Sequence, residues 1–165
     1  MSIEREKPNI FTTREMVADD IAAVLPMLHE SWLENTENSE TVSEEFFEKT
    51  NSAEWLEGFL ANEGHGVVAE MNGEIAGAIL FQIETSPEYY VTERHLMVMD
   101  VVVDAEYRRL GIATQLEKEA EDFARENNIS LVLGEVWAYN EKSKRLMKEL
   151  GRHPLYVVYG KMVDE

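Results

Sequence analysis

The sequence contains no cysteine and few positive charges. Without cysteine, disulfides, thiolate-bound zinc and a cysteine nucleophile are all excluded. The four histidines are scattered without the spacing of a metal site, so no metal is expected. Lysine and arginine number 15 against 33 acidic residues, which gives a formal net charge of -18. This charge repels a phosphate backbone and no basic stripe offsets it, so nucleic acid is not an expected partner.

Long apolar runs are also lacking. Residues 1–7 are charged and lack the apolar stretch of a signal peptide, and no later run reaches membrane-spanning length. The expectation is a cytoplasmic protein with no membrane association. With 165 residues and 44% hydrophobic content, the chain can bury one substantial core, so residues 1–165 are expected to form a single domain.

The apolar patterns predict a mixed α/β domain. Strands are expected at 11–17, 67–71, 74–84, 96–103, 130–137 and 155–163. Helices are expected from Asp19-Asp20 to about Trp32, over 42–62 in two pieces, from Ile112 to Asn127-Asn128, and from Asn140 to Leu150. Pro26 should kink or delay the first helix without abolishing it, and a polar break follows at 35–39. Residues 50–52 can cap the second piece of 42–62, and Asn72-Gly73 predicts a two-residue hairpin turn.

The turn at 107–114 lies between the apolar run 96–103 and the helix that begins at Ile112. Gly111 allows the backbone to approach a ligand closely, and the first amides of a helix point outward without partners. The helix dipole adds partial positive charge there, and Arg108 and Arg109 add two full charges in an otherwise acidic chain. The turn is therefore predicted to bind an anionic ligand.

Two motifs resemble those of the GCN5-related N-acetyltransferase superfamily. Arg108, Gly111 and Ala113 occupy the places of its pyrophosphate loop, with a strand before and a helix after. Val136, Asn140 and Leu150-Gly151 match its later signature of a strand, an asparagine and a helix that ends in Leu-Gly. The resemblance covers nearly the whole chain. It implies a mixed sheet of about six to seven strands with about four flanking helices, and an acetyl-CoA-dependent acetyltransferase.

The resemblance also implies which residues hold acetyl-CoA. The backbone of the central strand would meet the pantetheine arm and the thioester, the turn would hold the pyrophosphate, and the start of the last helix would contact the cofactor between two splayed strands. The implied cofactor-binding residues are Val101, Val102, Val103, Arg108, Arg109, Leu110, Gly111, Ile112, Ala113, Thr114, Asn140 and Ser143.

Acetyl transfer to an amine needs a base for the amine, a donor to the developing oxyanion and help for the departing thiolate. Glu135 is the first candidate base, because Gly134-Glu135-Val136 resembles a segment of ribosomal-protein N-terminal acetyltransferases. Asp100 is the second, since an acid inside an apolar strand is costly unless it is paired or used. Its structural alternative is to cap a bulge or pair with an arginine. The oxyanion donor is expected to be a backbone amide at a strand bulge near Val101 or Val102.

The chain departs from the superfamily in its last helix. Met147 stands where members usually carry the tyrosine that protonates the thiolate, and Arg152 replaces a phenylalanine after the glycine. The proton donor to the thiolate would then be Tyr139, Tyr156 or Tyr159, or a water molecule. Otherwise the thiolate would leave without a proton donor. This departure keeps a second hypothesis open, a non-catalytic sensor or interaction module that binds acyl-CoA.

The stretch from Glu34 to Glu57 contains eight glutamates and a single lysine, Lys49. In the superfamily this region borders the acceptor site. An acidic rim would attract a cationic amine, whereas the alternative is a solvated helix face on an acidic protein. Polyamines, aminoglycosides, a lysine side chain and a protein N-terminus all remain open as acceptors. The aromatic residues that could line such a site are Trp32, Phe46, Phe47, Trp55, Tyr89 and Tyr90. Because dimers are common in the superfamily, the resemblance also allows a homodimer.

Overall fold

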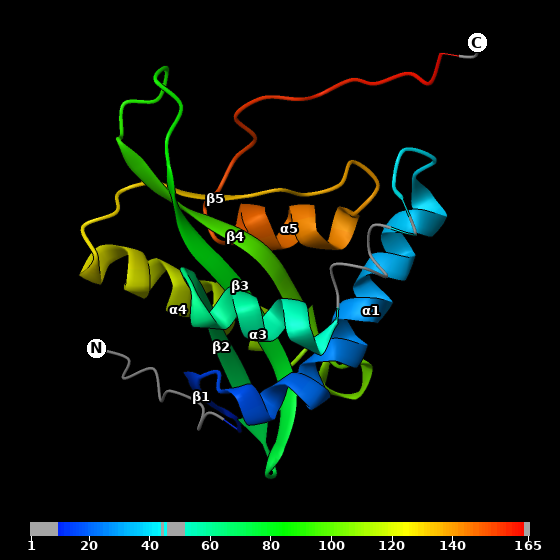
Figure 1. The fold of residues 1–165 in the computed structure, drawn as a ribbon, viewed down its shortest axis with the longest axis vertical. Helices are drawn as coiled ribbons and strands as arrows, with labels where there is room; N and C mark the ends of the chain where they lie inside the picture. The colour runs from blue at the N-terminus through cyan, green and yellow to red at the C-terminus, as the bar shows by residue number, and fades with distance from the viewer. Residues whose placement is uncertain (1–9, 44, 46–51, 164–165) are drawn as a thin grey trace, which may run out of the picture.

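A computed structural model describes residues 10–43, 45 and 52–163 (Figure 1). Its centre is a five-stranded sheet in the order β1-β2-β3-β4-β5. The strands are β1 (Thr12–Glu15), β2 (Gly64–Met71), β3 (Glu74–Thr85), β4 (Arg94–Val103) and β5 (Val132–Gly134). The first four pair antiparallel in sequence order, and β5 pairs parallel to β4. The predicted mixed α/β class is confirmed.

The hairpin between β2 and β3 forms at the predicted turn. Asn72 and Gly73 have φ angles of 55° and 82°, the two left-handed conformations that a type I′ turn requires. Asparagine and glycine tolerate this region better than other residues, so the turn determines where β2 ends and β3 begins. The long antiparallel pairs β2·β3 and β3·β4 then form the rigid middle of the sheet.

Helices cover both faces of the sheet (Figure 1). α1 (Ile21–Asn38) and α3 (Ala53–Ala61) pack through one buried cluster against Val68, Leu80 and Val102. α4 (Ile112–Glu126) packs on the opposite face through a second cluster. α5 (Glu141–Glu149) follows β5. Within the described residues, no helix is long and apolar enough to cross a membrane.

Two local expectations about the first helices can be compared with the structure. α1 continues through Pro26, as expected, and also through Asn35, where a break was predicted. The Ser52 hydroxyl accepts a hydrogen bond from the Trp55 backbone amide at 3.2 Å and caps α3, which confirms that part of the predicted cap. The other predicted capping residues, Thr50 and Asn51, lie outside the described residues.

The last predicted strand does not form, so the sheet has five strands and not six or seven. Residues 155–163 carry no strand assignment, and their apolar side chains are exposed (Figure 1). β5 is also short, with three residues against the eight predicted at 130–137. The physical reason is that apolar, branched residues favour a strand only when a neighbouring strand satisfies the backbone, and none lies beside 155–163 in the described part of the chain.

Candidate active site

The central strand β4 has a bulge at Met99. Leu80 of β3 pairs with Asp100, whereas the next residue, Phe81, pairs with Val98, so Met99 is the extra residue. The bulge changes which face each side chain meets. Val98 packs in the α4-side core, but Asp100, two residues later, contacts Trp32 of α1 on the other face. The bulge was expected near Val101 or Val102. Its extra residue, Met99, lies two positions before Val101.

β4 and β5 separate at this bulge. Their pairing runs from Leu96 with Val132 to Val98 with Gly134 and then stops, although β4 continues to Val103. Beyond the bulge, β4 is paired on its β3 side only, as in the pair of Ile79 with Val101. The backbone of 101–103 therefore has one edge without a strand partner within the described residues. An extended ligand can hydrogen-bond along such an edge.

The surroundings of Asp100, the second candidate base, alter its acidity. It is only partly exposed, and the Trp32 indole Nε1 donates a hydrogen bond to its Oδ1 at 3.2 Å. Burial raises the pKa of Asp100 to about 6 although the Trp32 bond favours the charged form. A carboxylate with a pKa of this kind is ionised at neutral pH and is still basic enough to accept a proton.

Glu135 and Tyr139 lie in the segment between β5 and α5. Glu135 directly follows β5, is exposed, and makes no hydrogen bond or ion pair to any residue that the structure describes. The Tyr139 hydroxyl donates a hydrogen bond to the Asn35 side-chain oxygen of α1. Burial, and then the charge of Glu34, raises the pKa of Tyr139 above its ordinary value. Tyr139 therefore holds this segment close to α1, on the face that carries Asp100.

The two other tyrosines considered as proton donors lie elsewhere. Tyr156 and Tyr159 are 66% and 92% exposed, on the segment that extends away from the sheet (Figure 1). Met147 contacts Arg152, with its sulfur 3.6 Å from Nη1. Of the three tyrosines, only Tyr139 reaches across from the β5–α5 segment to α1.

The predicted anion-binding turn has the expected backbone. Gly111, with φ 86°, stands immediately before α4, and Arg109 is also left-handed with φ 68°. Arg108 and Arg109 are exposed, as is Leu110. Arg108 donates from Nε to the Val103 carbonyl at 3.1 Å and from Nη2 to Glu30 at 2.8 Å, so it connects the turn to the end of β4 and to α1. The free amides of the first turn of α4 thus lie next to the unpaired edge of β4.

The first turn of α4 mixes core and surface positions. Ile112 is buried and packs in the α4-side cluster, so only its backbone is available to a ligand. Ala113 and Thr114 are partly exposed. At α5, the Asn140 side-chain oxygen accepts a hydrogen bond from the Ser143 amide at 3.0 Å and caps the helix. This bond holds the oxygen and leaves the amide nitrogen of Asn140 to point toward other groups.

The comparisons with known proteins agree with this geometry. The acetyltransferase (GNAT) family matches residues 25–151. The chain belongs to the acetyltransferase (GNAT) family. No curated protein matches the sequence, so the further comparisons are with solved structures. The prediction of an acetyltransferase is confirmed at the level of the family.

Three solved structures illustrate the shared fold. A predicted acetyltransferase with acetyl-CoA from Clostridium acetobutylicum has a TM-score of 0.72 at 18% identity, and the match covers 91% of this chain and 96% of that one. A GCN5-related N-acetyltransferase from Ralstonia eutropha has a TM-score of 0.73 at 18% identity, and the match covers 92% of this chain and 98% of that one. An aminoglycoside acetyltransferase from an uncultured soil metagenomic sample, in complex with sisomicin, has a TM-score of 0.67 at 16% identity. The match covers 94% of this chain and 98% of that one.

In this acetyltransferase, the indole that contacts Asp100 belongs to a row of aromatic side chains from α1 and α3. The rings of Trp32 and Trp55 meet edge to face, with centroids 6.4 Å apart, and Phe59 stacks on Trp55 at 5.5 Å. Sequence reasoning named Trp32 and Trp55 but did not connect Trp32 with Asp100, and it treated Asn35 only as part of a break. No sequence signal links positions so far apart in the chain. Phe46 and Phe47 lie outside the described residues.

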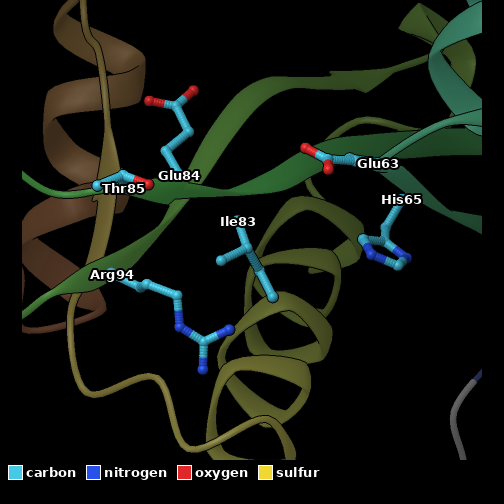
Figure 2. Close-up of a pocket in the computed structure, with 6 residues that line it drawn as sticks. All are labelled: Glu63, His65, Ile83, Glu84, Thr85 and Arg94. Carbon is cyan, nitrogen blue, oxygen red and sulfur yellow. The ribbon is translucent and has the colours of Figure 1, made fainter.

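Two hollows in the described part of the acetyltransferase are lined by other residues. One, of about 390 Å³, is at the far end of the β3–β4 hairpin, and Figure 2 shows its lining: Glu63, His65, Ile83, Glu84, Thr85 and Arg94. The second adjoins His65 on its other side and includes Phe81 and Phe123. Neither contains a predicted site residue. In the part of the chain that the structure describes, no group of acids and histidines is arranged to hold a metal ion.

Proposed function

We propose that this acetyltransferase transfers an acetyl group from acetyl-CoA to a cationic primary amine, on a small molecule or a peptide. The observation that carries the proposal is the position of Asp100. This carboxylate of raised pKa lies directly after the β4 bulge, where β4 and β5 separate. A proton acceptor is thereby placed beside the backbone edge that suits an extended thioester.

The residues along this edge suit acetyl-CoA. The arm would lie along the unpaired edge of 101–103, and the pyrophosphate would accept hydrogen bonds from the turn of residues 108–114. No atom lies within 4 Å of the place where a Cβ on Gly111 would be, so a phosphate can approach the backbone there. The amide nitrogen of Asn140, with Ser143, borders the same opening from α5. Acetyl-CoA supplies an acyl group on a good leaving thiolate, and the Clostridium structure of the same fold contains it.

The reaction proposed for these residues is direct attack within a ternary complex. The amine nitrogen bonds to the thioester carbonyl carbon, the carbon–sulfur bond breaks, and the amine proton passes to Asp100 or, in the alternative, to Glu135. A β4 amide at the bulge stabilises the oxyanion. In place of the usual tyrosine, whose position Met147 occupies, Tyr139 donates its hydroxyl proton to the thiolate after that proton turns away from the Asn35 oxygen, which accepts it in the structure.

The charge and aromatic character of the α1 side support a cationic acceptor. Asp100 contacts Trp32, which packs against Trp55, and Trp55 stacks on Phe59. Glu34 is close enough to Tyr139 to raise the pKa of that tyrosine. Aromatic faces and carboxylates together attract ammonium groups. The soil acetyltransferase of the same fold was solved with sisomicin, an aminoglycoside ligand, which also favours this class.

The test is free-thiol release from acetyl-CoA with polyamines, aminoglycosides, amino acids and N-terminal peptides, combined with calorimetric titration of coenzyme A. We expect saturable turnover with a cationic amine. Coenzyme A binding without turnover on any amine would favour the non-catalytic sensor. Absence of coenzyme A binding would contradict the assignment of residues 108–114.

A further inference from the structure

The face of the sheet that carries Asp100 also carries a second carboxylate, Glu84 of β3. Leu80 pairs with Asp100, and alternate residues of a strand share a face, so Glu84 lies on this face farther along β3. Figure 2 shows the Glu84 side chain on the opposite side of the strand from Ile83, which packs with the α4-side cluster. At the rise of a strand, the levels of Leu80 and Glu84 are about 13 Å apart.

Glu84 has one carboxylate oxygen that is free to accept a hydrogen bond. The Gln82 side-chain amide donates to Oε1 at 2.7 Å, whereas Oε2 accepts from none of the described residues. Oε2 lies 3.5 Å from Nε2 of His95, which is too far for a good hydrogen bond. His95 is 3% exposed, and its Nε2 is buried without a hydrogen-bond partner in the same part of the chain. Buried polar atoms of this kind are rare and mark a place where a ligand or water completes the network.

The loop between β3 and β4 holds His95 in this position. Ser86 Oγ lies 3.0 Å from His95 Nδ1, and the Tyr90 ring meets the imidazole edge to face with centroids 6.3 Å apart. Tyr89 packs against Tyr90 at 5.0 Å. Both tyrosines are among the aromatic residues that could line an acceptor site. The loop therefore places an aromatic ring beside His95, at the Glu84 end of this face.

A row of aromatic rings runs along this face from Asp100 toward the β3–β4 loop. The row is Trp32, Trp55 and Phe59, with successive ring centroids 6.4 and 5.5 Å apart. It begins at Asp100, which accepts from Trp32, and ends at Gly64 of β2, where the Phe59 ring lies 2.5 Å from the place of a Cβ. Gly64 pairs with Gln82. The row therefore follows the strands over most of the distance between the two carboxylates.

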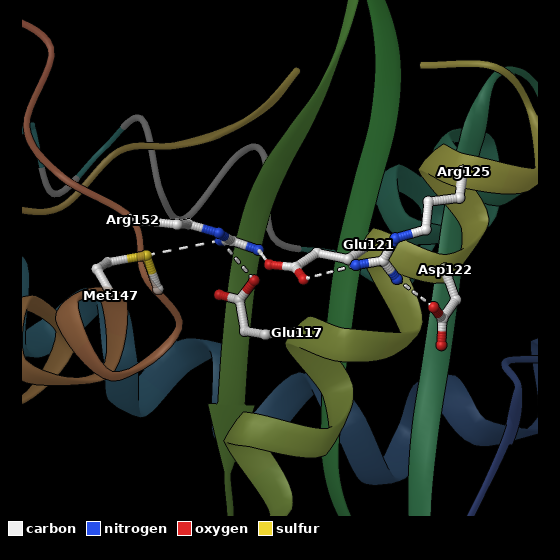
Figure 3. A network of polar contacts seen from close by, with 6 residues as sticks. All are labelled: Glu117, Glu121, Asp122, Arg125, Met147 and Arg152. Carbon is white, nitrogen blue, oxygen red and sulfur yellow. Dashed lines mark hydrogen bonds and ion pairs between the residues drawn. The ribbon is translucent and has the colours of Figure 1, made fainter. Parts of the chain in front are cut away.

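The end of α5 is held on the opposite face of the sheet. Arg152, which follows the helix, pairs with two carboxylates of α4: Nη1 is 2.7 Å from Glu117 and Nη2 is 2.9 Å from Glu121 (Figure 3). Glu117 is 1% exposed, so releasing Arg152 would leave a buried charge without its counter-charge, which is strongly unfavourable. Gln82 and Met97, between the levels of the two carboxylates, are partly exposed. This part of the face is therefore accessible to a ligand.

Two carboxylates connected by a row of aromatic rings suit an extended polyamine. Carboxylates bind ammonium groups through charge-assisted hydrogen bonds, and aromatic faces attract cations. We propose that Glu84 binds a second ammonium group of the acceptor while the amine to be acetylated lies at Asp100. The acceptor is then a linear polyamine long enough to bridge about 13 Å. This inference rests on the proposed acetyl transfer and adds the class of acceptor and the residue that selects it.

The test compares spermidine with putrescine, which also has two terminal amines but whose chain is too short to bridge the two carboxylates. Isothermal titration of each polyamine into the protein with coenzyme A gives the affinities, and free-thiol release from acetyl-CoA gives kcat and KM. The variant is Glu84→Gln, which keeps the size of the side chain and removes its charge. The matched control is Glu63→Gln, which removes the same charge from an exposed residue beside the start of β2 (Figure 2).

Glu84→Gln should weaken spermidine binding and raise the KM for spermidine about tenfold, because a charge-assisted hydrogen bond is lost. The affinity for putrescine and the kcat should stay within about twofold, and Glu63→Gln should leave both polyamines within the same limit. Absence of spermidine binding, or unchanged spermidine affinity in Glu84→Gln, would overturn the proposal. Equal weakening of both polyamines, or in both variants, would also overturn it, since overall charge would then explain the effect.

The two measurements separate this proposal from the proposed function. If no amine is acetylated but spermidine binding still depends on Glu84, the acetyl transfer is wrong and the polyamine site stands. If amines are acetylated but Glu84→Gln treats spermidine and putrescine alike, the acetyl transfer stands and the polyamine site is wrong.

Discussion

The turn before α4 and the surroundings of Asp100 are assembled in different ways. The turn is one stretch of chain, 108–114, and its ligand-facing groups are backbone amides and two exposed arginines. The surroundings of Asp100 depend on contacts between separate elements: Trp32 of α1 donates to Asp100, and Trp55 of α3 packs against Trp32. A contiguous site can be recognised from its own residues, whereas an assembled one appears only when the helices are packed.

The two regions also differ in what holds their charged groups. The ion pair between Arg108 and Glu30 joins side chains that are 45% and 57% exposed, so water screens it and it contributes little to folding. Asp100 is desolvated, and the structure bears the cost of keeping it ionised. Changes in the turn should therefore affect ligand affinity alone, and changes at Asp100 should affect activity and stability in opposite directions.

The largest effect is expected from Asp100→Asn, which keeps the size of the side chain and a group that accepts from Trp32 but removes the base. Turnover should fall ~100-fold, because a positioned proton acceptor typically contributes that much or more. In the unchanged protein kcat/KM should rise with pH through about 6, the pKa of Asp100, and the variant should lack this step. Steady-state kinetics between pH 5 and 9 measure both.

Glu135→Gln is the matched comparison, because Glu135 is an exposed carboxylate that directly follows Gly134, the last β5 residue paired with β4. If Asp100 is the base, this variant keeps the step near pH 6. A loss of turnover in Glu135→Gln, with normal kinetics in Asp100→Asn, would assign the base to Glu135 and contradict the role of Asp100.

A smaller effect is expected in the turn. Arg108→Ala/Arg109→Ala should weaken coenzyme A binding about tenfold while the melting temperature stays nearly unchanged, since both side chains are exposed. Isothermal titration with coenzyme A gives the affinity. The control is Lys118→Ala/Arg125→Ala, which removes the same charge farther along α4. Equal weakening in both double variants would mean that overall charge, and not this turn, attracts the phosphates.

The smallest effect is a gain in stability. The folded pKa of Asp100 is raised from 3.8 to about 6, so native protein binds this proton more tightly than unfolded protein does. The contribution of Asp100 to stability is therefore present below about pH 4 and is lost as pH rises through about 6. At pH 7 Asp100→Asn should be more stable by on the order of 1 kcal/mol, a figure reduced for partial exposure. Urea unfolding at pH 7 and pH 4 checks the sign: the gain should disappear at pH 4.

Elements with a local cause were predictable. The Asn72-Gly73 turn, the glycine before α4, the Ser52 cap and the Asn140 cap each depend on a few neighbouring residues, and all appear in the structure. Features that depend on a residue far away in the chain could not be predicted from the sequence. The strand expected at 155–163 has no neighbouring strand among the described residues, and the position of the bulge at Met99 depends on how residues 80 and 81 of β3 pair with Asp100 and Val98.

The sequence by itself determined the mixed α/β class, the hairpin, the buried central strand and the glycine turn before α4, because backbone conformation and apolar spacing act over short stretches of chain. The tertiary structure alone decided that the indole of Trp32 meets Asp100, that Tyr139 reaches Asn35, and that Arg152 is held between Glu117 and Glu121. These contacts arise from the packing of helices on both faces of the sheet, which joins residues far apart in the chain. The acidity of Asp100 is a consequence of that packing, since desolvation depends on what surrounds a group and not on its neighbours in sequence.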